Sequence, residues 1–90
     1  MARYRVMSWQ GIPAQVNAQD DAGVRAKRMM PDWFAQEIDR VAMRDGLVGT
    51  DAYTEGWAWS AWAEMPGSAD EVADAVVLQQ ASDWRRDGGD

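Results

Sequence analysis

Carboxylates are the most numerous groups in this chain that could do chemistry, and the sequence contains fifteen of them. Paired Asp and Glu side chains can act as general acid and base, but here almost all of them fall in expected loops or helix starts, where solvation or capping accounts for them. Asp20 and Asp21 lack the ligand spacing of a calcium loop. The chain has no His and no Cys, which excludes imidazole catalysis, thiol catalysis and structural zinc. We therefore expect no catalytic residue, no metal and no cofactor, and predict that the protein is not an enzyme.

A short basic run, Arg25-Ala26-Lys27-Arg28, interrupts this acidic background. It precedes an expected helix, and the free backbone N–H groups of a helix N-terminus attract anions. A tryptophan at the start of that helix could stack beside the cations, so a folate or a nucleotide would suit the pairing. The alternative is an exposed cationic loop that offsets the acidic surface or pairs with the acidic residues before it. The predicted ligand-binding residues are Arg25, Lys27, Arg28 and Trp33.

Three of the six tryptophans lie in the stretch AYTEGWAWSAWAEM, residues 52–65, which alternates in places with period two. We predict a strand over residues 52–64, with Trp57 and Trp59 packed against helices and Trp62 on the opposite face. The segment RYRVMSW near the N-terminus places further apolar groups on that opposite face. Large apolar side chains on a sheet face that should be polar indicate a contact surface. The predicted partner interface consists of Met7, Trp9 and Trp62.

The elements that must position these residues are a β-hairpin over residues 3–18, a helix over 31–45, the strand over 52–64 and a helix over 69–86, followed by a frayed tail, 87–90. Residues 24–30 are ambiguous between a short strand and an irregular approach. The order ββαβα predicts an α+β fold in two layers. We expect a three-stranded, mainly antiparallel sheet of order 2-1-3, with both helices on one face and residues 1–90 in a single domain.

Composition and charge restrict the classes of partner that the protein could bind. The formal net charge is −6, which makes nucleic acid and anionic membranes poor partners for the molecule as a whole. The N-terminus lacks the apolar core of a signal peptide, and no apolar run reaches the length of a membrane span. We expect a cytoplasmic protein.

Four segments, MARYRVMSWQGIPAQVNAQDD, MPDWFAQEID, GLVGTDAYTEGWAW and SADEVADAVV, together resemble a family of short bacterial proteins grouped under the name virulence factor. The resemblance spans residues 3–77, and GTDAYTEGW is its most distinctive piece. It implies an accessory role beside one-carbon metabolism, with its corrinoid methyltransferases and methylenetetrahydrofolate reductase, and it supplies no catalytic residues.

Two functions follow as hypotheses. The first is an accessory interaction protein without catalytic activity, which binds a protein partner or a second copy of itself through the outer sheet face. The alternative is a binding protein for a small anionic molecule, which uses the basic segment before the first helix.

Overall fold

The sheet begins with a hairpin of two long strands, β1 (Ala2–Trp9) and β2 (Ile12–Asp20), in the computed structural model, which describes residues 1–87. The two-residue turn consists of Gln10 and Gly11, whose φ angles are 47° and 85°. Positive φ at both positions matches the turn twist that hairpins favour. The predicted hairpin is therefore confirmed, with both strands slightly longer than expected.

Three further strands extend the sheet to five, all of them antiparallel to their neighbours. The ambiguous residues 24–30 contain β3 (Arg25–Met29), which pairs with β2. On the other side, β1 pairs with β4 (Trp57–Trp59) and also with β5 (Ala63–Met65). The strand order is β3-β2-β1-β4, so the prediction of three strands was wrong, although β1 does lie between β2 and the tryptophan-rich segment.

The first long helix, α1 (Asp32–Arg44), follows the predicted span 31–45 closely. It ends because Gly46 adopts a positive φ of 70°, a conformation that glycine tolerates without a Cβ penalty. The Leu47 N–H then donates to the Ala42 carbonyl at 2.8 Å, which folds the chain back on the last turn.

The second long helix, α3 (Ala69–Asp87), confirms the helix predicted over residues 69–86. Its start is a capping box: the Ser68 N–H donates to Glu71 Oε1 at 3.0 Å, and the Glu71 N–H donates to Ser68 Oγ at 3.2 Å. The tail was predicted for 87–90, but Asp87 is the last residue of α3, and residues 88–90 fall outside the described residues.

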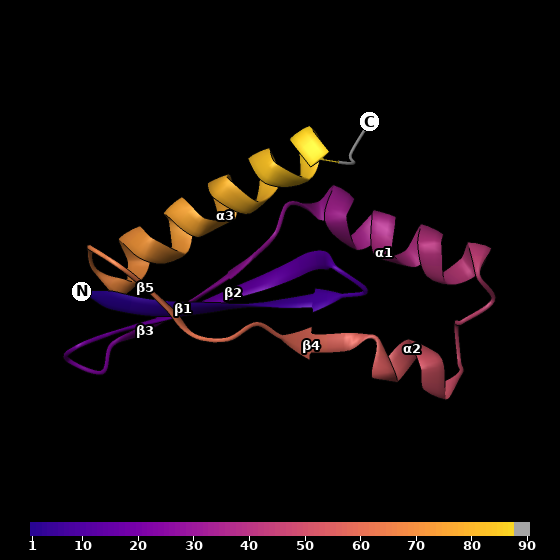
Figure 1. Ribbon diagram of the computed structural model, residues 1–90, viewed down its shortest axis with the longest axis horizontal. Helices are drawn as coiled ribbons and strands as arrows, with labels where there is room; N and C mark the ends of the chain where they lie inside the picture. The colour runs from indigo at the N-terminus through magenta and orange to yellow at the C-terminus, as the bar shows by residue number, and fades with distance from the viewer. Residues whose placement is uncertain (88–90) are drawn as a thin grey trace.

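Both long helices lie on one side of the sheet (Figure 1). Helix α3 packs across β1, β2 and β3, and α1 packs against β2. Apolar stripes from both helices meet alternate residues of the strands and form the core. The larger buried side chains of this core are Val6, Trp9, Ile12, Val16, Met30, Phe34, Ile38, Val72 and Val76.

Residues 52–64 do not form the single strand that their alternation predicted. The segment starts as a short helix, α2 (Asp51–Glu55), before β4 and β5. Thr50 caps this helix, because its side-chain oxygen accepts a hydrogen bond from the Tyr53 N–H at 3.3 Å. Local capping therefore outweighs the weak period-two pattern at the start of the segment.

A bulge separates β4 from β5. Between the Met7–Trp59 pair and the Tyr4–Ala63 pair, β1 has two residues and the opposite segment has three. Ser60 bridges the gap: its N–H donates to a β1 carbonyl at 2.8 Å, and its hydroxyl accepts a β1 N–H at 2.9 Å. Because directly opposite residues share a face, Trp59 lies with Met7 on the face away from the helices. The prediction that Trp59 fills the core was wrong.

Candidate functional site

The outer face of the sheet, which points away from α1 and α3, carries the side chains that alternate with the buried ones. Val6, Val16 and Ala26 are buried on the helix side, so the residues between them project outward. The strand register aligns the outward side chains in three rows: Arg3, Gln19 and Arg25; Arg5, Asn17 and Lys27; and Met7, Gln15 and Met29. Cations therefore occupy both sides of the face, and amides occupy the middle.

Two tryptophans stack on the arginines of β1. The Arg5 Cζ atom lies 4.1 Å from the ring centroid of Trp59 and 4.7 Å from that of Trp62. The Arg3 Cζ atom lies 5.0 Å from the Trp62 centroid. Each such contact stabilises by about 0.5–1 kcal/mol at an exposed site, and more where water is excluded. The two indoles fix the position of the Arg5 guanidinium over β1.

The cations of the outer face form no ion pairs among the described side chains, whereas cations elsewhere do. Arg28 pairs with two carboxylates of α3, Arg40 pairs with Glu37, and Arg44 pairs with Asp45. Among the described residues, no carboxylate forms an ion pair with Arg3, Arg5, Arg25 or Lys27, although Glu64 lies opposite Arg3 in the strand register. The charges of Arg5, Arg25 and Lys27 are therefore available to a ligand.

A cavity of about 310 Å³ lies on the outer face, between the Arg5 side and the β3 side. This volume is at the lower end of the range for small-molecule sites. Short amide side chains of β2 line the cavity between the longer side chains of β1 and β3. We call it the cationic pocket, and its outward side chains are Arg5, Asn17, Gln19, Arg25, Lys27 and Trp62.

The polar groups of the cationic pocket are mainly hydrogen-bond donors. Asn17 Oδ1 already accepts from Gln15 Nε2 at 2.8 Å, and Gln19 Oε1 accepts from Arg3 Nη2 at 3.4 Å. These bonds leave the two amide NH₂ groups facing a potential ligand. The Nε atom of Arg5 is buried without a hydrogen-bond partner. A site in which cations and hydrogen-bond donors outnumber acceptors favours an anionic group.

The four predicted ligand-binding residues do not come together. Arg25 and Lys27 lie on the outer face, but Arg28 points to the helix side, where its Nη2 and Nε atoms donate to Asp70 and Asp74 at 2.9 and 2.8 Å. These hydrogen bonds, that to Asp70 first, raise the pKa of Arg28 above its ordinary value. Arg28 is thus engaged in a structural bridge between β3 and α3.

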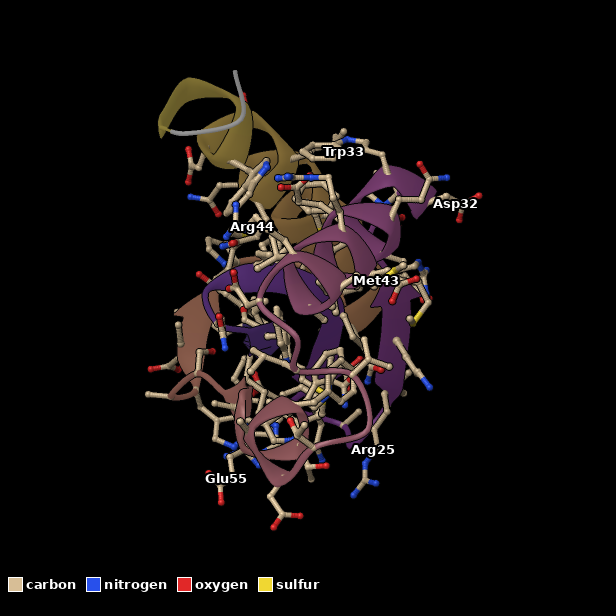
Figure 2. All side chains as sticks on the ribbon, turned by 90° about the vertical axis from the view of Figure 1, so that its right-hand side faces the viewer. Arg25, Asp32, Trp33, Met43, Arg44 and Glu55 are labelled. Atoms are coloured by element: carbon tan, nitrogen blue, oxygen red, sulfur yellow. The ribbon has the colours of Figure 1, made fainter. Side chains whose placement is uncertain are left out.

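Trp33 is also distant from the basic segment. Its ring stacks on Phe34 at 4.3 Å between centroids and lies 6.4 Å from the ring of Trp84 on α3. Figure 2 shows Trp33 at the end of the molecule opposite to Arg25. The predicted joint site of these two residues is therefore wrong, because Trp33 joins the two helices.

Of the predicted interface residues, Trp9 is inaccessible. It follows Met7 by two positions on β1, but α2 covers it and its exposed fraction is 0%. Its indole N–H donates to the Tyr53 carbonyl at 2.8 Å, and the two rings lie 5.5 Å apart. Trp62, by contrast, is 42% exposed and borders the cationic pocket. The two predicted sites thus merge into one surface that retains Met7, Trp62, Arg25 and Lys27.

The described carboxylates are not grouped into a metal site, and Glu71 and Glu37 have structural roles. Within the residues that the structure describes, no group of three or more Asp and Glu side chains could hold a metal ion. Glu71 serves the capping box, and hydrogen bonds from the Ser68 backbone and hydroxyl lower its pKa. The hydrogen bond from Arg40 lowers the pKa of Glu37. Neither carboxylate faces the cationic pocket.

Arg5, Asn17, Gln19 and Trp59 are site residues that sequence reasoning did not select. The alternation of RYRVM placed Arg5 on the face of Met7, which is a usable signal. The position of β3 beside β2 was the missing information, because it alone brings Lys27 into register with Asn17.

Comparison with known proteins gives one match. Residues 7–87 match the model of the family described as virulence factor. The chain belongs to the virulence factor family. The match covers the last three residues of β1, the other four strands and all three helices, and it confirms the resemblance noted from the sequence. No curated protein and no solved structure matches the chain significantly. Along the described residues, no helix has both the length and the apolar character needed to cross a membrane.

Proposed function

We propose that this member of the virulence factor family is an accessory binding protein, without catalytic activity of its own, that holds a small anionic ligand in the cationic pocket. One observation supports this most strongly. The outer face collects cations without ion pairs among the described side chains, although the chain carries fifteen carboxylates. Selective clustering of one charge on an acidic molecule creates a local potential that concentrates the opposite charge.

The acidic remainder of the molecule favours a small ligand over a large polyanion. At one end of the outer face, Arg3 lies near Asp20, Asp21 and Glu64, which line a separate polar depression. A nucleic acid that crossed the sheet would meet these carboxylates and be repelled. A ligand confined to the cationic pocket would not.

Folates and nucleotides are the first ligands to test, because each combines anionic groups with a flat aromatic ring. Trp62 offers an exposed indole at the border of the pocket, next to Arg5. A ring of the ligand would stack on this indole while the anionic group binds the cations.

Docking of a protein partner on the same face is a second candidate function. Two large apolar side chains of this face are exposed, Met29 at 63% and Trp62 at 42%. Aromatic residues and methionine are enriched at protein interfaces. A partner that fits this face would present an acidic segment to the cations and apolar groups to Met29 and Trp62.

Thermal-shift screening with anionic metabolites, followed by calorimetry, tests the proposal. A ligand at one hundred times its Kd adds about 2.7 kcal/mol to the free energy of unfolding, which raises the Tm by about 11–22 °C in a domain of this size. The variant Arg5→Gln should lose most of this shift. The matched control is Arg44→Gln, which removes the same charge from α1, away from the outer face.

Two results would contradict a ligand in the cationic pocket. One is the absence of a shift with every anion in the panel. The other is an equal shift in the wild type and in Arg5→Gln, since this would place the binding site elsewhere. Co-purification of an acidic protein that Trp62→Ala abolishes, without any small-molecule shift, would favour the second candidate.

A further inference from the structure

The geometry points to a ligand that carries two separate anionic groups, one bound by Arg5 and the other by Lys27 and Arg25. This inference rests on the proposed function and specifies the chemistry of the ligand. It follows from where the cations stand and from how freely each of them can move.

The cations stand on opposite sides of the pocket. Arg5 on β1 and Lys27 on β3 are both in register with Asn17 on β2, which lies between them. Their backbones are therefore two strand spacings apart, roughly 9–10 Å. Arg25 lies two residues from Lys27 on the same face, about 6–7 Å along the strand.

Cation–π contacts favour a position of the Arg5 guanidinium on the β1 side of the pocket, away from the cations of β3. Trp59 and Trp62 hold it at centroid distances of 4.1 and 4.7 Å. A single carboxylate or phosphate on Arg5 would therefore leave Lys27 and Arg25 uncompensated. A second anionic group, carried on a spacer, is needed to satisfy both sides.

The floor of the pocket fits such a spacer. The free NH₂ groups of Asn17 and Gln19 lie between the two cationic sides and can donate to oxygen atoms of the ligand. Carboxylates and phosphates share the required chemistry, since both accept several hydrogen bonds from guanidinium and ammonium groups. The inference therefore concerns an organic dianion with its charges at the two ends of the molecule.

Calorimetric titration of the whole chain at constant ionic strength tests this. The probes are the dicarboxylates succinate, adipate and suberate, the monocarboxylate octanoate, and a bisphosphonate of the same chain length as suberate. If two anionic groups bind, the longer dicarboxylates should bind roughly tenfold or more tightly than octanoate and succinate, because the second contact becomes intramolecular. Comparison of suberate with the bisphosphonate identifies which oxyanion the site prefers.

Variants locate the two ends. Lys27→Gln with Arg25→Gln should reduce suberate to the affinity of octanoate and leave octanoate unchanged, whereas Arg44→Gln should change neither. Unchanged circular dichroism melts would show that the variants fold, as expected for side chains that are exposed. If octanoate binds through Arg5 and no dianion binds more tightly, the two-group inference is wrong and the proposed function stands. If no anion binds, both are wrong.

Discussion

The contact between Gly56 and Trp9 gives a sharp test of how the end of the outer face is covered. Gly56 has φ −71° and ψ −17°, which any residue can adopt, so Gly56→Ala introduces no backbone strain. A Cβ atom there would lie 2.6 Å from Trp9 Nε1 and 2.9 Å from Cδ1. Real Cβ contacts are not this short, so either the indole or α2 must shift.

The indole has little room to shift. Trp9 is fully buried, and its N–H bond to the Tyr53 carbonyl fixes the ring at 2.8 Å from the same helix that Gly56 terminates. Overpacking a buried site costs about 1–3 kcal/mol. The reduced entropy of the unfolded chain offsets about 0.4–1 kcal/mol of this cost. We therefore expect Gly56→Ala to lower the free energy of unfolding by about 1–2 kcal/mol.

Urea denaturation followed by far-ultraviolet circular dichroism measures this loss without depending on tryptophan emission. The double-mutant cycle adds Trp9→Phe, which removes the Nε1 atom and the closest contact. Trp9→Phe alone should also destabilise, because it breaks the bond to Tyr53 and leaves a gap. In that background Gly56→Ala should cost less than about 0.5 kcal/mol, a coupling expected of residues in contact. A neutral Gly56→Ala, or an equal cost in both backgrounds, would refute the assignment of α2 as the cover of Trp9.

Three further predictions concern the outer face and the helices. Trp62→Ala should lower the free energy of unfolding by no more than about 1 kcal/mol, as measured by chemical denaturation. The reason is that the side chain is exposed and that its main contacts are the cation–π stacks with Arg3 and Arg5. Arg28→Gln should destabilise the protein at low salt, less so at high salt, while leaving anion binding intact, as melts and titrations at two ionic strengths would show. The folded-state pKa of Glu71 is lowered, so the ionised side chain stabilises the folded protein fully above the ordinary pKa of 4.5. This stabilisation is lost as the pH falls through the folded-state pKa. In melts recorded across this pH range, Glu71→Gln should therefore remove this part of the decline in Tm at acid pH.

Each of these three has a clear contradictory result. Global unfolding of Trp62→Ala would mean that the indole belongs to the core. Loss of anion binding in Arg28→Gln would return this residue to the ligand site. An unchanged decline of Tm with pH in Glu71→Gln would mean that other carboxylates account for acid sensitivity.

The helices could be predicted because their signals are local. Ser68 and Glu71 stand three residues apart and reciprocally cap α3, and Gly46 ends α1 where the apolar stripe ends. Both features depend on residues within one or two turns. Tertiary packing then follows the same stripes, so local and global preferences agree.

The site was only partly predictable because its decisive contacts are long-range. Arg28 follows the alternation of β3 and points to the helix side together with Ala26. A cation is tolerated there because Asp70 and Asp74, more than forty residues away, neutralise it. The burial of Trp9 depends on Tyr53, forty-four residues away in sequence. No local sequence pattern encodes these long-range contacts. The sequence therefore indicated which types of residue on β1 and β3 could bind a ligand, but not which of them lie together in the pocket.

The bulge at Ser60 also bears on aggregation. Exposed sheet edges invite pairing with other chains, and natural proteins interrupt such edges with bulges and with charged side chains. Here β4 and β5 have three residues each, and three residues that begin with Ser60 separate them. At the opposite edge, Arg28 Nη1 donates to the Lys27 carbonyl at 3.0 Å and so occupies an acceptor that an added strand would use. Strand addition is thereby hindered at both edges of a small, tryptophan-rich sheet. The broad outer face, rather than the edges, is left open to binding.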